Sequence, residues 1–102
     1  MSVTVTISVN ASGNYSSSLN PSEPSGGYPH PVTFTFDAPS TVGVTLYFQC
    51  VPAMASFPTS KTLTAGGSYT TPSIPSALTV NYNMVAPGTA NPGTYAHVIH
   101  IG

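Results

Sequence analysis

Four side chains in this sequence are of the types that bind transition metals: Cys50 and the histidines His30, His97 and His100. His97 and His100 lie three residues apart in a segment that alternates like a β-strand. Residues three apart on a strand point to opposite faces, so this pair does not converge on one ion. A tetrahedral site needs three or four converging ligands. We therefore expect no metal site and no cofactor.

The nucleophilic side chains do not form a recognisable catalytic motif. Cys50 shares one face of an alternating segment with Leu46 and Phe48, where a free cysteine behaves as a small apolar residue. A reactive thiol needs exposure and a nearby cation. The many serines lack a nucleophile-elbow motif, and a triad also needs a base oriented by a carboxylate. We predict no catalytic residues and a protein that is not an enzyme.

Tyrosines are the side chains best suited to recognition, because exposed aromatic rings stack on sugar faces and anchor protein interfaces. Tyr82 alternates with apolar residues and is expected in the core, whereas Tyr47 lies opposite the apolar face of its strand. A carbohydrate-binding hypothesis, with a glycan as partner, therefore depends on four tyrosines: Tyr15, Tyr28, Tyr47 and Tyr69.

Charge is scarce throughout the chain. Only Glu23, Asp37 and Lys61 are charged among 102 residues, whereas an average domain carries charge on about a quarter of its residues. One cation cannot neutralise a phosphate backbone, so we expect no nucleic-acid partner. With so little charge repulsion, self-association is expected. No apolar run approaches the ~18 residues typical of a spanning helix, so we also expect no membrane insertion.

Apolar residues alternate with polar ones in most of the chain, and no segment has helical periodicity. The pattern predicts strands at 1–10, 32–36, 42–50, 61–65, 68–71, 78–84 and 94–101. The second and third of these are expected to pair as a hairpin, and Gly66-Gly67 is expected to join a shorter one. About seven short strands separated by Pro and Gly turns are typical of an antiparallel immunoglobulin-like β-sandwich in a single domain. A jelly roll or a small barrel is the alternative.

The segment Pro92-Gly93-Thr94-Tyr95, followed by an alternating strand, resembles the entry to a late strand in bacterial and phage immunoglobulin-like modules. The resemblance covers about ten residues, and Pro-Gly turns alone favour such a run. It implies a surface or virion module. Some bacterial surface sandwiches also carry a Lys–Asn or Lys–Asp isopeptide bond, but their Lys lies near the domain start. Lys61 is central, so we interpret it as an exposed lysine that guards an edge strand.

The N-terminal segment 1–10 carries Val3, Val5, Ile7 and Val9 on one face and hydroxyls on the other. The segment 11–31 that follows is rich in Gly, Ser, Asn and Pro and is expected to be a long loop or tether. A tethered strand can pair in its own sandwich, as an ordinary first strand, or in a neighbour's, as an exchanged assembly strand. Both alternatives remain open from the sequence.

The sequence therefore favours a non-enzymatic structural or assembly subunit on an exterior surface, either a virion accessory protein or a filament subunit. Its expected partners are further copies of itself or other subunits of the assembly. No signal peptide is visible, because 1–10 lacks a basic region and a continuous apolar run. The expected location is extracellular or in a virion. The alternative is a carbohydrate-binding module that uses the four tyrosines.

Overall fold

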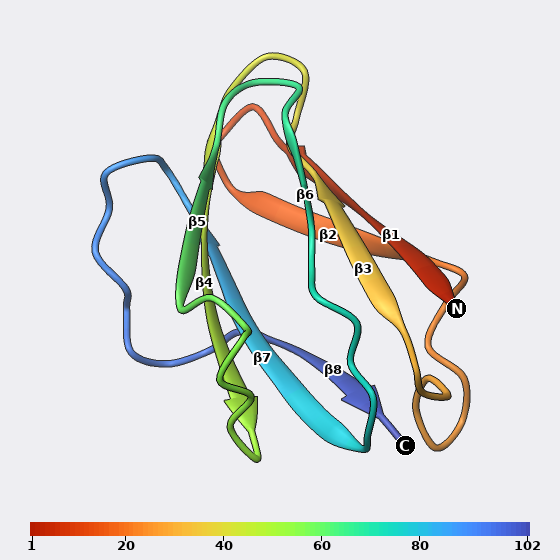
Figure 1. Cartoon of the computed structure of the whole chain (residues 1–102). Helices are drawn as coiled ribbons and strands as arrows, with labels where there is room; N and C mark the ends of the chain where they lie inside the picture. Colours follow the sequence, from red (N-terminus) through yellow and green to blue (C-terminus); the bar gives the residue numbers. More distant parts are fainter.

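The computed structural model describes residues 1–102 as an all-β protein of eight strands. Figure 1 shows them in sequence colours, and no helix that could cross a membrane is present. The strands are β1 (Ser2–Val9), β2 (Tyr15–Asn20), β3 (Thr33–Asp37), β4 (Val44–Val51), β5 (Ser60–Leu63), β6 (Ser68–Thr70), β7 (Leu78–Val85) and β8 (His97–Ile101).

The strands form two sheets of four, in the orders β2-β1-β3-β6 and β5-β4-β7-β8. All neighbouring pairs are antiparallel except β1 and β3, which run parallel. In Figure 1 the two sheets lie as separate layers, with β1, β2 and β3 on one side and β4, β5 and β7 on the other. The expected all-β sandwich architecture is thus confirmed.

The core lies between the sheets and follows from the period-two pattern of the strands. One cluster of 19 buried apolar residues takes side chains from both layers. Phe36 of the first sheet contacts Phe48 and Tyr82 of the second, with ring centroids 5.3 and 5.5 Å apart and the rings edge to face. Such geometry adds to the stabilisation that burial of the rings provides.

Two expected hairpins are wrong. β3 and β4 belong to different sheets, so residues 38–43 cross between the layers. The turn at Gly66-Gly67 also crosses, because β5 pairs with β4 whereas β6 pairs with β3. Alternation identifies the side of a strand that faces the core, but a sandwich core is bordered by two sheets. The pattern therefore fits either layer.

Residues 21–31 form no strand, as expected of a loop, but the expectation that the whole of 11–31 is a loop or tether is wrong. It contains β2, which pairs antiparallel with β1 from Thr4↔Asn20 to Val9↔Tyr15. Further on, Tyr28 is fully buried, and its N–H donates to the His100 carbonyl oxygen at 2.9 Å. The segment is therefore attached to both sheets.

Candidate functional site: an open sheet edge

The four tyrosines of the carbohydrate hypothesis do not form a common surface. The expectation that Tyr28 is exposed is wrong: its exposed fraction is 0%, its ring packs edge to face on Phe34, and its hydroxyl donates to the Pro21 carbonyl at 2.6 Å. Burial, followed by the nearby Glu23 carboxylate, raises the pKa of the Tyr28 phenol. The ring is a core anchor.

The other three tyrosines are half-buried, and each is engaged within the chain. The Tyr15 hydroxyl donates to the Gly43 carbonyl at 2.7 Å, from the inner face of β2. The Tyr47 hydroxyl donates to the Thr89 carbonyl at 2.6 Å, from the outer face of the second sheet. Tyr69 packs against the core. Because these rings lie on different faces, they provide no stacking platform.

The two C-terminal histidines do point to opposite faces of β8, as their spacing predicted. The imidazole of His97 stacks on the Tyr82 ring at 5.1 Å between centroids, and burial lowers the pKa of His97. His100 is exposed, and its Nδ1 lies 3.1 Å from Glu23 Oε2. No group of three or more His, Cys, Asp or Glu side chains is placed to hold a metal ion.

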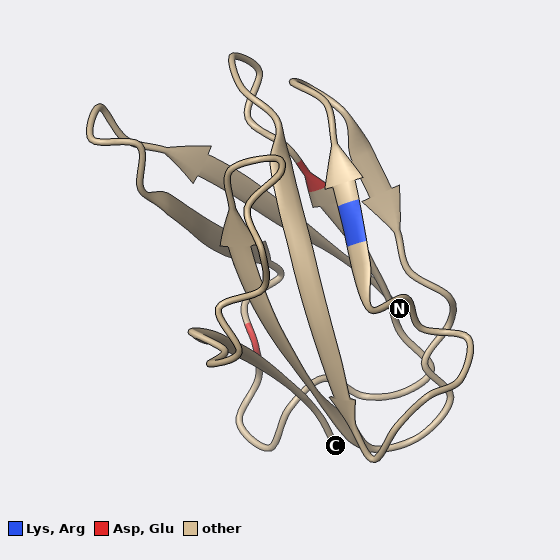
Figure 2. Cartoon of the chain, turned by 90° about the vertical axis from the view of Figure 1, so that its left-hand side faces the viewer, with Lys and Arg blue, Asp and Glu red and all other residues tan.

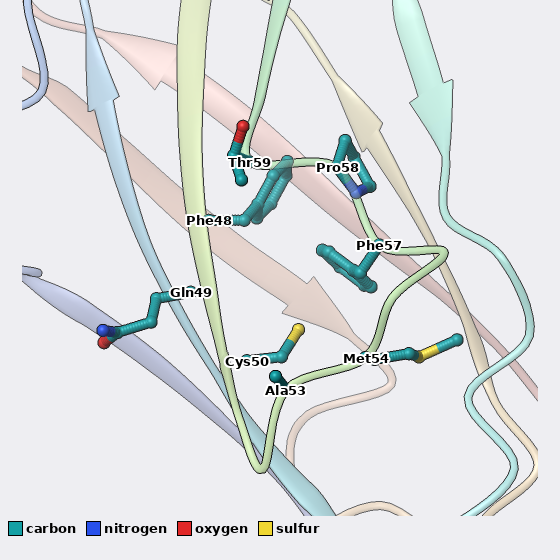
Figure 3. Close-up of a pocket in the computed structure, with 8 residues that line it drawn as sticks. All are labelled: Phe48, Gln49, Cys50, Ala53, Met54, Phe57, Pro58 and Thr59. Carbon is teal, nitrogen blue, oxygen red and sulfur yellow. The ribbon is translucent and has the colours of Figure 1, made fainter.

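A pocket of about 210 Å³ lies beside the end of β4 (Figure 3). It lies between β4 and the segment 52–59, with lining residues that include Phe48, Cys50, Met54 and Phe57. Cys50 lies on the core-facing side of β4 as expected, but it is only half-buried. Burial raises the pKa of its thiol. A thiol held protonated is a weak nucleophile, so this site offers shape but little reactivity.

The expected assembly strand is a central strand of its own sheet. Val3, Val5 and Ile7 are buried in the core, and Val9 is half-buried. β1 pairs with β2 on one side and with β3 on the other, so both of its edges are occupied within the chain. In the structure, β1 therefore pairs within its own chain, and the edges of this sheet are formed by β2 and β6.

A tight turn directs the chain from β1 into β2. Asn10 Oδ1 accepts hydrogen bonds from the backbone N–H groups of Ser12 and Asn14, at 3.0 and 2.9 Å. Gly13 has a φ of 82°, in the region that favours glycine. An asparagine side chain that bonds two residues ahead is a recurrent turn device. This turn sets the register in which Ile7 lies opposite Ser17.

The backbone groups on the outer edge of β2 follow from the same turn. Asn10 N–H donates to the Asn14 carbonyl, and bonded pairs alternate along an antiparallel ladder. The even-numbered residues of β2 therefore bond to β1. Tyr15, Ser17 and Leu19 direct their N–H and C=O groups away from β1, where no other strand of the chain lies.

The outer edges of the second sheet are both protected. On β5, the exposed Lys61 lies opposite Leu46 of β4, on the side of the sheet that faces β6. Its Nζ lies 5.0 Å from the centroid of the Tyr69 ring of β6. A lysine on an edge strand opposes pairing with another chain. On β8, the segment 23–28 covers the C-terminal part of the edge, at His100 and Gly102.

Three backbone groups at the end of the chain, two of His100 and one of Gly102, form hydrogen bonds with this segment. The His100 carbonyl accepts from Tyr28 N–H, Gly102 N–H donates to the Tyr28 carbonyl at 2.9 Å, and His100 N–H donates to Glu23 Oε1 at 2.7 Å. Gly27 has a φ of 91°, and a Cβ there would lie 2.7 Å from the His100 oxygen. Glycine at 27 therefore permits the close approach that covers β8.

The remaining edges belong to the first sheet, and they differ in length. β6 has three residues, whereas β2 has six, with the sequence YSSSLN. β2 contains no charge and no proline, and the charges are sparse over the whole molecule (Figure 2). Short edge strands, charges and covering segments are the usual protections against pairing. β2 has none of them, so its outer edge is the candidate site.

Comparison with protein-family models, with curated proteins and with solved structures gives no match for this chain. The site is therefore interpreted from its own geometry. Sequence reasoning missed β2 because three consecutive serines favour a loop. The available signal was the alternation of Tyr15, Ser17 and Leu19 after a turn that contains Gly13.

Proposed function

We propose that this protein is a non-enzymatic structural subunit of an exterior assembly, a virion accessory protein or a filament subunit, that associates with other subunits through the outer edge of β2. One observation carries the proposal. Lys61 guards the edge of β5, the segment 23–28 covers the C-terminal part of the β8 edge, and β6 is short, whereas β2 presents unpaired backbone groups along a six-residue strand. Unpaired edges bind a further strand by backbone hydrogen bonding.

The surface next to this edge supports the proposal. The outward-facing residues of β1 are Ser2, Thr4, Thr6 and Ser8, and those of β2 are Ser16, Ser18 and Asn20. None of them carries a charge that would repel an approaching copy. The scarcity of ionisable groups also makes stability weakly dependent on pH, which suits an exterior environment.

The finer fold assignment, an immunoglobulin-like sandwich, is part of the proposal. It is supported by the connections, since the chain changes sheet between β3 and β4, between β5 and β6 and between β6 and β7. Such changes are typical of Greek-key sandwiches. The parallel pairing of β1 with β3 is a local variation on that plan.

Light scattering of the full chain over a range of concentrations tests the proposed association. We expect a mass above that of the 10.4 kDa chain. A variant with Ser16→Lys and Ser18→Lys is expected to remain monomeric, because both side chains are exposed at the edge. The matched control is Ser68→Lys with Thr70→Lys on β6, also exposed and on the same sheet, which is expected to retain the wild-type mass. A wild-type monomer at every concentration would contradict the proposal.

A further inference from the structure

We infer that the partner of the β2 edge is a second copy of β2, antiparallel to the first, with a two-fold axis through Ser17. This inference specifies the partner of the proposed assembly and therefore depends on the proposed function. It joins the β2-β1-β3-β6 sheets of two molecules into one continuous sheet. Three features support it: the direction of the backbone groups, the faces of the side chains and the lack of charge on β2.

The free backbone groups determine the register. They belong to Tyr15, Ser17 and Leu19, because Asn10 N–H donates to the Asn14 carbonyl at 3.0 Å and the bonded pairs then alternate. The β1–β3 pairing agrees with this assignment. Thr33 N–H donates to the Met1 carbonyl at 2.9 Å, so the odd-numbered residues of β1 direct their backbone N–H and C=O groups toward β3.

A second β2 can match all of these groups in a single register. When Ser17 faces its own copy, Tyr15 faces the second copy's Leu19, and about six backbone hydrogen bonds form. A shift by two residues in either direction leaves the free groups of one end residue in each copy unpaired. The symmetric register therefore pairs more backbone groups than its neighbours.

The side chains are compatible with this register on both faces. Tyr15 and Leu19 are half-buried, lie on the inner face and pack against the core. Their contact across the axis extends the apolar layer, and aromatic–aliphatic cross-strand pairs stabilise sheets. On the outer face, Ser16 lies opposite the second copy's Ser18. No charged residue lies on either strand, so the same surface is complementary to itself, as a two-fold interface requires.

Disulfide formation between two single-cysteine variants tests the register. Cys50→Ser, the background, removes the only native thiol. Ser16→Cys and Ser18→Cys are made separately in it, and each is oxidised alone and after mixing. Directly opposed residues of a non-hydrogen-bonded pair have Cα atoms ~4.5 Å apart, within the span of a disulfide. In a dimer of one variant alone, the two introduced cysteines are diagonal neighbours, whose Cα atoms lie roughly 7 to 8 Å apart. This distance is beyond the span of a disulfide.

We expect a cross-linked dimer in the mixture and several-fold less in either variant alone. Equal cross-linking of one variant alone would overturn the register. If wild-type chains associate in light scattering but the mixture does not cross-link, the inference is wrong. The Ser16→Lys, Ser18→Lys variant then decides the proposed function: it stands if this variant is monomeric and fails if the variant associates like the wild type. If the Cys50→Ser chain and the wild type are both monomeric at every concentration, the proposed function itself is wrong.

Discussion

Replacement of Tyr28 tests whether the segment 21–31 is anchored in the core, as the structure requires. The ring is completely buried, and Tyr28 also pairs with the edge of β8 through its backbone. Tyr28→Ala deletes the ring and leaves a cavity beside Phe34. Deletion of a buried aromatic side chain costs about 3 to 5 kcal/mol of unfolding free energy. A domain of this size has a total of about 5 to 15 kcal/mol.

A second variant separates the ring from its hydroxyl. Tyr28→Phe keeps the contact with Phe34, whose centroid is 5.4 Å away, and loses only the hydrogen bond to the Pro21 carbonyl. The expected cost is about 1 kcal/mol. Tyr95→Ala is the matched control, since Tyr95 is only half-buried and its hydroxyl accepts from the Asn91 side chain.

Urea denaturation followed by circular dichroism gives the unfolding free energies of the variants. We expect the loss to decrease in the order Tyr28→Ala, Tyr28→Phe, with Tyr95→Ala close to the wild type. Hydrogen exchange should also show faster exchange of the Gly102 amide in Tyr28→Ala, because its acceptor is the Tyr28 carbonyl. If Tyr28→Ala costs no more than Tyr95→Ala, the segment is not anchored and the reasoning is refuted.

Three further predictions concern Lys61, Cys50 and His97. Lys61→Thr is expected to raise the light-scattering mass by exposing β5, with little change in the thermal midpoint; an unchanged mass would show that this lysine protects nothing. Because burial raises its pKa, the Cys50 thiol should react with a thiol reagent more slowly in the folded chain than in urea, and equal rates would count against that burial. Burial lowers the pKa of His97, so the unfolded chain binds a proton more readily and stability should fall as pH decreases below about 6.5. In urea titrations at two pH values, His97→Phe should reduce this decrease, and an identical decrease would refute the assignment.

Much of the fold could be predicted from the sequence because alternation is strong where strands are long. Val3, Val5 and Ile7 point into the core, as their spacing indicated, and Tyr82 is buried among the apolar residues of β7. Lys61 is exposed on an edge strand, as interpreted. These features depend on period-two burial, which is encoded locally.

The candidate site could not be predicted in the same way, because it depends on contacts between distant segments. β2 is half-buried and serine-rich, so its pairing with β1 comes from the Asn10 turn rather than from hydrophobicity. Tyr28 lies among Gly and Pro residues, and its burial depends on the edge of β8, at the other end of the chain. Sheet membership of β3 and β4 is likewise a tertiary property.

Hydrogen exchange resolved by NMR at low and high protein concentration tests the central claim, that the outer edge of β2 pairs with another chain. The amides of Tyr15, Ser17 and Leu19 face away from β1, whereas those of Ser16 and Ser18 bond to it. We predict that the first group exchanges rapidly in dilute protein and becomes protected as concentration rises, while Ser16 and Ser18 are protected throughout. Rapid exchange of Tyr15, Ser17 and Leu19 in a sample that light scattering shows to be oligomeric would contradict the account.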